Sequence, residues 1–161
     1  MKTLLRFCAD DRGQSIVELA IIAPLFLVLL FGTIDIGAFM YDGIEVGNAA
    51  RAGVQYGISN KLTTGDAAGI RQAALDDAKD ITGLIVTPNA TFSSYTYCAC
   101  DNSQGTTFSC TANAVPCPKP DRLDVFVEVD TSASFSPLIA LPGLPSTITI
   151  AKSAVQIVSP Q

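Results

Sequence analysis

The hydrophobic pattern near the N-terminus predicts a helix that crosses a membrane. Residues 19–34 form a run of sixteen without a charge, and apolar residues continue for several positions beyond Asp35. A helix needs about 20 mostly apolar residues to cross a hydrocarbon core that is ~30 Å thick. The run reaches that length only if Glu18 and Asp35 lie near the two membrane surfaces. We therefore predict a transmembrane stem helix over residues 14–41.

Beyond the stem, residues 42 to about 60 keep apolar positions at helical spacing, so the helix is predicted to continue out of the membrane. Ala49, Gly53 and Gly57 lie four residues apart and share one face of this helix. Small residues at this spacing let two helices approach closely. We therefore predict that this face is buried among copies of the chain.

The next segment has the pattern of an amphipathic helix, predicted over roughly 66–82 with Thr64 or Asp66 as its N-cap. After residue 83 the hydrophobic period changes from that of a helix to that of strands. Residues 123–130 alternate most clearly, and their valines are predicted to face the core. The pattern predicts an α+β fold, in which a long N-terminal transmembrane helix and a second amphipathic helix accompany a small antiparallel β-sheet.

Three other segments are predicted strands: residues 84–87, 90–100 and 147–152, the last of which residues 154–158 could prolong. Between the last two strands, residues 135–145 contain three prolines and five large apolar side chains. The prolines exclude regular structure there. We expect this segment to cover the core rather than to dock a partner, because apolar loops usually lie over a core.

These elements divide the chain into a leader at residues 1–13, the stem helix at 14–41, a helical region at 42–82 and an antiparallel β domain at 83–161. The leader is basic, and the far side of the stem is acidic. The basic residues are Lys2, Arg6 and Arg12, and the acidic ones are Asp35, Asp42 and Glu45. Because a basic flank stays in the cytoplasm, we predict a single-pass protein with a cytoplasmic N-terminus and an exported C-terminal domain.

Four of the five cysteines cluster in the β domain, whereas Cys8 lies in the leader. An even number of cysteines in an exported domain predicts two disulfides among Cys98, Cys100, Cys110 and Cys117. The first two are too close in sequence to bond well, which leaves 98 with 110 and 100 with 117, or a nested pairing of 98 with 117 and 100 with 110. The turn-like residues 101–105 favour the nested pairing. A four-thiolate zinc site would need two residues between paired cysteines, whereas the gaps here are one and six.

Composition excludes several classes of function. The chain has no histidine, so a Ser-His-Asp triad, a Cys-His pair and a His-ligated metal site are all impossible. Its net charge of −5 and its lack of a basic stripe argue against nucleic-acid binding. Asp76, Asp77 and Asp80 are most simply a solvated helix face, because adjacent helical positions point apart. We predict no catalysis, no cofactor and no bound metal.

The junction between leader and stem combines Gly13, Gln14 and, four residues later, Glu18. A carboxylate at the mouth of an apolar helix is costly in a bilayer and indicates a function. A cleaved secretory signal would need a small-residue site just after a shorter apolar core. A plain signal anchor would need neither the glycine nor the glutamate. The junction instead resembles a prepilin leader, which a membrane peptidase cuts after the glycine.

The resemblance covers most of the chain. Its helical part consists of residues 12–20, 23–25, 29–32, 35–37 and 48–53, and the cysteine-bearing middle and residues 135–145 add to it. Together these segments resemble the TadE-like (TadE/TadG) minor pilins or pseudopilins of tight-adherence, or Flp-type, pilus systems. The resemblance implies a type IV pilin-like fold and a bacterial inner-membrane protein whose C-terminal domain is periplasmic, or extracellular once it is in a pilus.

The same resemblance implies that a prepilin peptidase cleaves the chain between Gly13 and Gln14. It also implies a role in the assembly or at the tip of an adhesive pilus, with other pilins and the pilus assembly machinery as partners. Glu18 is predicted to be an assembly charge, because a buried carboxylate that is satisfied only by a partner enforces register.

Two other functions fit parts of the sequence. A membrane-anchored periplasmic binding or sensing module that never polymerises would use the disulfide domain to bind a ligand, but it would have no use for Gly13 or Glu18. A type II secretion pseudopilin is a closer alternative, because it shares the leader and the stem.

Overall fold

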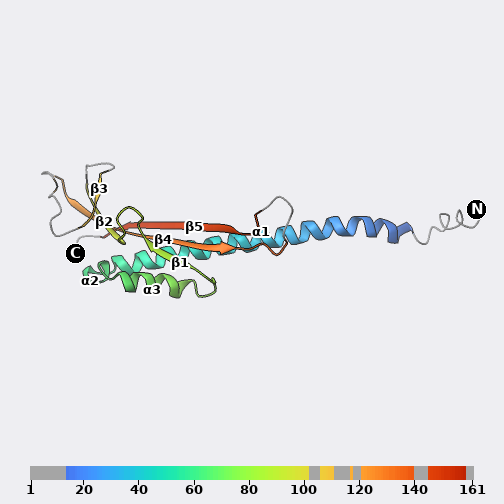
Figure 1. The fold of residues 1–161 in the computed structure, drawn as a ribbon, viewed down its shortest axis with the longest axis horizontal. Helices are drawn as coiled ribbons and strands as arrows, with labels where there is room; N and C mark the ends of the chain where they lie inside the picture. Colours follow the sequence, from blue (N-terminus) through green and yellow to red (C-terminus); the bar gives the residue numbers. More distant parts are fainter. Residues whose placement is uncertain (1–13, 102–105, 111–116, 118–120, 140–144, 159–161) are drawn as a thin grey trace, which may run out of the picture.

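The computed structural model describes residues 14–101, 106–110, 117, 121–139 and 145–158. It consists of one long helix and a small domain that packs along the C-terminal part of this helix (Figure 1). The N-terminal part of the helix projects away from the domain, so the molecule is elongated. The predicted α+β fold, with a long apolar N-terminal helix, an antiparallel sheet and disulfides, is confirmed.

Helix α1, Gln14–Ile58, runs without a break for 45 residues, or about 67 Å at 1.5 Å per residue. The predicted continuation of the helix past residue 41 is therefore confirmed. A short helix α2, Lys61–Thr64, follows at once and is capped by Asn60. The Asn60 side-chain oxygen accepts hydrogen bonds from the backbone N–H groups of Leu62 and Thr63.

Helix α3, Ala67–Asp77, begins where the sequence predicts, with Asp66 as its N-cap. It ends before residue 82, the predicted boundary. The adjacent aspartates at its C-terminus account for the early end, because negative charge there opposes the helix dipole. The chain then turns at Gly83, whose φ of 75° favours glycine.

Five antiparallel strands form one sheet with β4 at its centre. The strands are β1 (Ile85–Pro88), β2 (Thr96–Cys100), β3 (Thr107–Phe108), β4 (Leu123–Phe135) and β5 (Ile148–Ile157). Strand β5 pairs with one edge of β4, whereas β1 and β2 pair with successive parts of the other edge. Strand β3 extends the sheet beyond β2.

The short strand β3 was not predicted, and two of the predicted strands differ from the observed ones by several residues. Strand β4 continues past residue 130, because buried side chains keep alternating through Thr131, Ala133 and Phe135. Strand β2 occupies only the end of the predicted segment 90–100. The Asn89 side-chain oxygen accepts two backbone hydrogen bonds from the residues that open this segment, and an asparagine turn of this kind competes with a strand.

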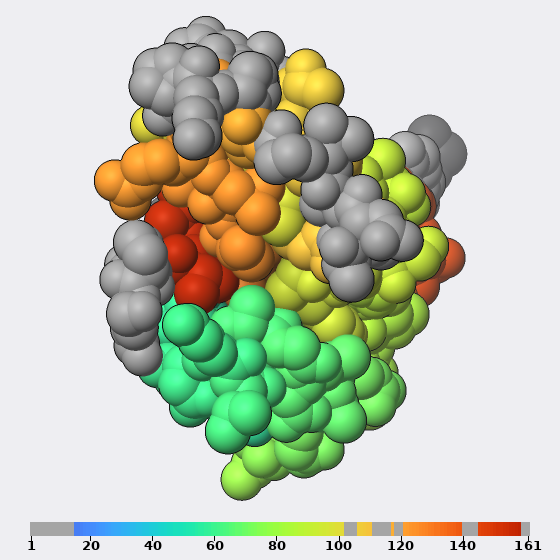
Figure 2. Space-filling view, turned by 90° about the vertical axis from the view of Figure 1, so that its left-hand side faces the viewer, coloured from blue at the N-terminus to red at the C-terminus, as the bar shows by residue number. Residues whose placement is uncertain are grey.

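Helices and strands form two layers, which Figure 2 shows in green on one side and in orange and red on the other, seen along the long axis. The core between the layers contains Val127 and Val129 from β4, both fully buried, so the prediction that these valines face inward is confirmed. A second buried cluster lies nearer the projecting part of α1. Its members are Val46, Ala133, Phe135 and Ile150.

The small-residue face of α1 packs against its own domain, so the prediction that it is buried among copies is wrong. A Cβ added to Gly53 would lie 3.1 Å from the carbonyl oxygen of Ile70 and 3.3 Å from the side chain of Val129. A Cβ added to Gly57 would lie 2.8 Å from Val127. The glycines therefore let α3 and the sheet approach α1. The predicted close packing is present, but its partner is the chain's own domain rather than another copy.

The two disulfides join Cys98 to Cys110 and Cys100 to Cys117, with Cα–Cα distances of 5.3 and 5.6 Å. The nested pairing favoured from the sequence is therefore wrong. Its physical reason is the register of β2 and β3, in which Cys98 lies opposite Phe108. Continuing this antiparallel register would place Cys110 opposite Thr96, which is two residues from Cys98 but four from Cys100.

Candidate membrane stem and assembly surface

The N-terminal half of α1 exposes an almost continuous apolar surface. It lies within Ser15–Ile58, a helix long and apolar enough to cross a membrane, and no part of its most apolar stretch is buried by the rest of the chain. The exposed large apolar residues of this half are Ile16, Val17, Leu19, Ile21, Ile22, Leu25, Phe26, Leu27, Val28, Leu29, Leu30, Phe31, Ile34, Ile36, Phe39, Met40, Tyr41 and Ile44. In water such a surface would be unfavourable, so it requires lipid or protein around it.

Glu18 lies near the start of the described part of α1, and its side chain is exposed among these apolar residues. Within the described residues, no hydrogen bond or ion pair joins its carboxylate to another group. Gln14, four positions earlier, is the first described residue, whereas Gly13 and Cys8 lie outside the described residues. Glu18 is exposed, so its carboxylate is available to a partner outside the described residues.

Asp35, the other carboxylate of the apolar stretch, has a partner within the domain. The backbone N–H of Leu138, which follows β4, donates a 2.9 Å hydrogen bond to Oδ1 of Asp35. Sequence reasoning missed this contact, since the two residues are 103 positions apart. Two features of the sequence could have suggested it: an isolated acidic residue within the apolar stem, and an apolar segment interrupted by prolines that needs hydrogen-bond partners for its backbone.

The domain is joined to the stem by packing close to this hydrogen bond. The rings of Phe39 on α1 and Phe135 on β4 meet edge to face, with their centroids 5.5 Å apart. The hydroxyl of Thr131 donates a 2.7 Å hydrogen bond to the backbone carbonyl of Val46. Phe135 is the last residue of β4 and belongs to the buried cluster itself. Leu138 is 71% exposed and does not cover the core as the segment 135–145 was expected to, and residues 140–144 lie outside the described residues.

A polar cluster joins the far end of α1 to α3. The hydroxyl of Tyr56 donates a 2.9 Å hydrogen bond to one carboxylate oxygen of Asp66, while the other oxygen accepts a hydrogen bond from the Gly69 N–H. The Gly69 N–H and then the Tyr56 hydroxyl stabilise the ionised carboxylate and hold the pKa of Asp66 below its usual value. The same hydrogen bond raises the pKa of Tyr56.

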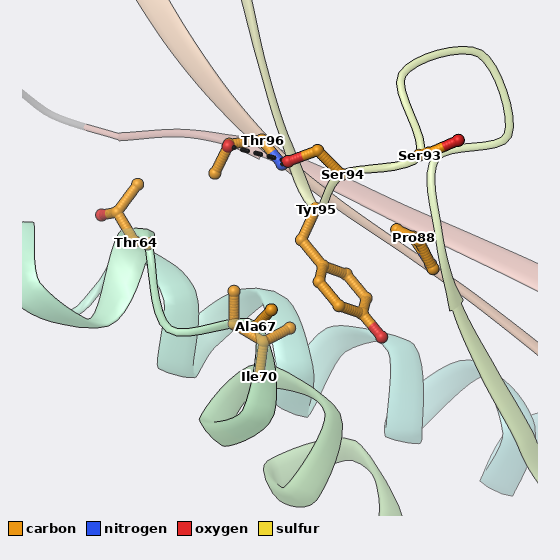
Figure 3. A pocket seen from close by; sticks show the side chains of 9 residues that line it. Thr64, Ala67, Ile70, Pro88, Ser93, Ser94, Tyr95 and Thr96 are labelled. Atoms are coloured by element: carbon orange, nitrogen blue, oxygen red, sulfur yellow. Dashed lines mark hydrogen bonds between the residues drawn. The ribbon is translucent and has the colours of Figure 1, made fainter. Parts of the chain in front are cut away.

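A hollow of about 260 Å³ lies between the start of α3 and the segment that connects β1 to β2 (Figure 3). Tyr95 and Ile70 face each other across it, and burial raises the pKa of the Tyr95 hydroxyl. Its lining is apolar or hydroxylic, with no carboxylate, cation or cysteine among the lining residues. Such a lining provides no acid–base pair, so the apolar stem is the better candidate for the functional surface.

Comparison with known families points to the same region. Residues 13–55 match a family model described as TadE-like protein. The resemblance to the TadE-like family is thus confirmed over the stem and most of the remainder of α1. No curated protein and no solved structure shows significant similarity to the chain.

Proposed function

We propose that this chain, whose residues 13–55 are TadE-like, is a minor pilin or pseudopilin that takes part in the assembly or at the tip of a Tad-type adhesive pilus. The family match suggests involvement in a Tad pilus system. The exposed apolar stem supports a subunit that is first held in the inner membrane and then transferred to a filament.

One observation carries this proposal: the TadE-like match begins at residue 13, and the exposed carboxylate of Glu18 and the apolar stem follow at once. A leader that is removed after Gly13 would leave a mature chain that begins four residues before Glu18. We infer that a prepilin peptidase makes this cut and that residues 1–13 are its leader.

The proposed stem works by exchanging one apolar environment for another. In the membrane its exposed side chains contact lipid, and in a filament they contact the stems of neighbouring subunits. Glu18 can reach the cytoplasmic interface in the first state, because it directly precedes the uncharged run of residues 19–34. In the second state its carboxylate needs a cation, for which the new amino terminus at Gln14 of a neighbouring subunit is the proposed partner.

The proposed topology follows the charge asymmetry of the flanks, with residues 1–13 in the cytoplasm and the domain from about residue 42 in the periplasm or on the pilus. Other pilins and the assembly machinery are then the partners of the stem. The role proposed is structural rather than catalytic.

The first test of the proposal is the mass of the native protein. We expect the intact protein to begin at Gln14 and a Gly13→Arg variant to remain full length, since the peptidase needs a small residue at the cut. Gly13→Ala is the matched control and should still be processed. If the native chain keeps residues 1–13, processing is ruled out and a membrane-anchored module that does not polymerise becomes the better explanation.

The second test separates processing from assembly at Glu18. We expect Glu18→Gln to be cleaved and inserted normally but to give few or no surface pili, because it keeps the shape and loses the charge. Glu18→Asp keeps the charge and should retain more assembly. Processing, membrane level and surface pili are measured side by side. Normal piliation of the Gln variant would show that Glu18 is no assembly contact, and lost cleavage would make it a determinant for the peptidase.

A further inference from the structure

We propose that the β4–β5 tip, defined as residues 136–139, is a second membrane contact that enters the lipid interface on the domain side of the bilayer. Leu138 is its central residue, and phospholipid is the partner. This inference goes beyond the proposed function and needs only that α1 crosses a membrane.

Two contacts fix the position of the tip along the axis of α1. The Leu138 N–H donates to the carboxylate of Asp35 at 2.9 Å. One residue before the tip, the ring of Phe135 contacts that of Phe39. These two contacts place the tip beside residues 35–39 of the stem, at the end of the domain that faces the projecting part of α1 (Figure 1).

This level coincides with the expected edge of the bilayer. From Gln14 to Asp35 the helix rises about 30 Å at 1.5 Å per residue, which equals the thickness of a hydrocarbon core. The helix around Asp35 is itself apolar and exposed, as Ile36 and Met40 show. The tip therefore continues an apolar surface that α1 already presents to lipid.

The surroundings of the tip suit lipid better than water. No charged residue occurs in the sequence between Asp130 and Lys152. Lys152 itself lies over Gly47, twelve residues beyond Asp35 and thus about 18 Å farther from the bilayer. Leu138 is 71% exposed at the end of the domain nearest the membrane, where an apolar side chain gains by entering the interface.

The hydrogen bond to Asp35 removes the main obstacle to such a contact. A carboxylate and a free backbone N–H are both costly at the edge of a hydrocarbon core. Here each satisfies the other, so the tip and the stem present mainly apolar groups outward. A second copy of the chain could also cover Leu138. Whenever α1 crosses a membrane, however, the surface of the bilayer lies beside Leu138, and we therefore assign the contact to lipid.

The absence of tryptophan from the chain makes a direct test simple. Single variants Leu138→Trp, Phe26→Trp and Leu62→Trp are reconstituted as full chains in phosphatidylcholine vesicles that contain lipids brominated either high or low on the acyl chain. Phe26 is 65% exposed in the middle of the stem and reports the bilayer interior, whereas Leu62 is 88% exposed on α2 at the far end of the domain. All three sites are exposed, so each should accept the larger ring.

We expect the Leu138→Trp emission to be blue-shifted and quenched more by high than by low bromines. The Phe26→Trp emission should show the reverse order, and the Leu62→Trp emission should be quenched by neither. Equal emission and quenching at positions 138 and 62 would overturn the proposal. A blue shift at position 138 without bromine quenching, growing with protein density in the vesicle, would assign the tip to a second copy instead. Loss of quenching at position 26 would contradict the spanning stem itself.

Discussion

The two halves of α1 belong to one unbroken helix but have opposite surroundings. Large apolar side chains from Ile16 to Ile44 are exposed, whereas Val46 and Val54 are buried under the sheet and α3. The glycines show the same difference, since nothing lies within 4 Å of a Cβ added to Gly37, whereas one added to Gly57 would collide with Val127. The comparison teaches that one helix serves as a core element at one end and leaves the other end for a partner outside the chain.

The largest test of this comparison replaces one isoleucine in each region. Ile70 on α3 is 0% exposed against the buried half of α1, and Ile70→Ala should destabilise the domain by about 2–5 kcal/mol. Ile22 is 57% exposed on the stem, and Ile22→Ala should change the same quantity by less than about 0.5 kcal/mol. Urea unfolding in detergent, followed by near-ultraviolet circular dichroism, measures both. An equal loss in the two variants would show that the stem and the domain unfold as one unit.

A second pair of variants tests the glycines. Gly57→Ala should destabilise the domain by about 1–3 kcal/mol, because the new methyl group must displace Val127 or Ile70 in a packed core. Gly37→Ala meets no neighbour and should leave the unfolding midpoint nearly unchanged. Both variants replace glycine by alanine within a helix, so helix propensity changes equally in the two. The difference between their free energies of unfolding therefore reports packing alone. If Gly37→Ala were the more harmful of the two, an intramolecular role for the small-residue face would be untenable.

The smallest expected effect concerns acid. Because the folded state lowers the pKa of Asp66, this group contributes stability above its unfolded pKa, and that contribution is lost as pH falls through the folded value. We expect Asp66→Asn to show a weaker loss of stability between about pH 5 and pH 2 than the parent chain. The Asn side chain can still accept the Gly69 hydrogen bond, so the helix cap should survive.

Glu18→Gln is the control for this measurement, because no hydrogen bond or ion pair joins the Glu18 carboxylate to another described residue. Its acid unfolding curve should follow that of the parent. Identical pH profiles for the parent and for Asp66→Asn would mean that the Tyr56–Asp66–Gly69 cluster does not favour the ionised carboxylate.

Local patterns predicted the elements well, because helix and strand periods depend on neighbouring residues. The unbroken helix through residue 58, the cap at Asp66 and the inward valines of β4 all follow from such patterns. Apart from the ends of α3 and β2, which local residues changed, the errors concern choices between partners far apart in sequence. Spacing identified the close-packing face at Gly53 and Gly57 but did not say whether it meets another copy or the chain's own sheet.

The disulfides and the stem contacts teach the same lesson. Four clustered cysteines predicted two bonds, yet the choice between the two pairings depended on a strand register that the turn-like residues 101–105 did not reveal. The hydrogen bond from Leu138 to Asp35 depends on where the long strand β4 ends along α1. The sequence around Leu138 does not indicate this hydrogen bond, because every residue except proline has a backbone N–H that could donate.

Because the domain is firmly attached to α1, a tilt of the stem moves the whole domain. The helix continues without interruption from the stem into the domain, and contacts at Asp35, Phe39 and Val46 hold the sheet to it. A stem that tilts by about 20° would therefore swing the far end of α1, about 35 Å beyond Asp35, sideways by about 12 Å. A small change in the tilt of the stem would thus give a large displacement of the domain surface.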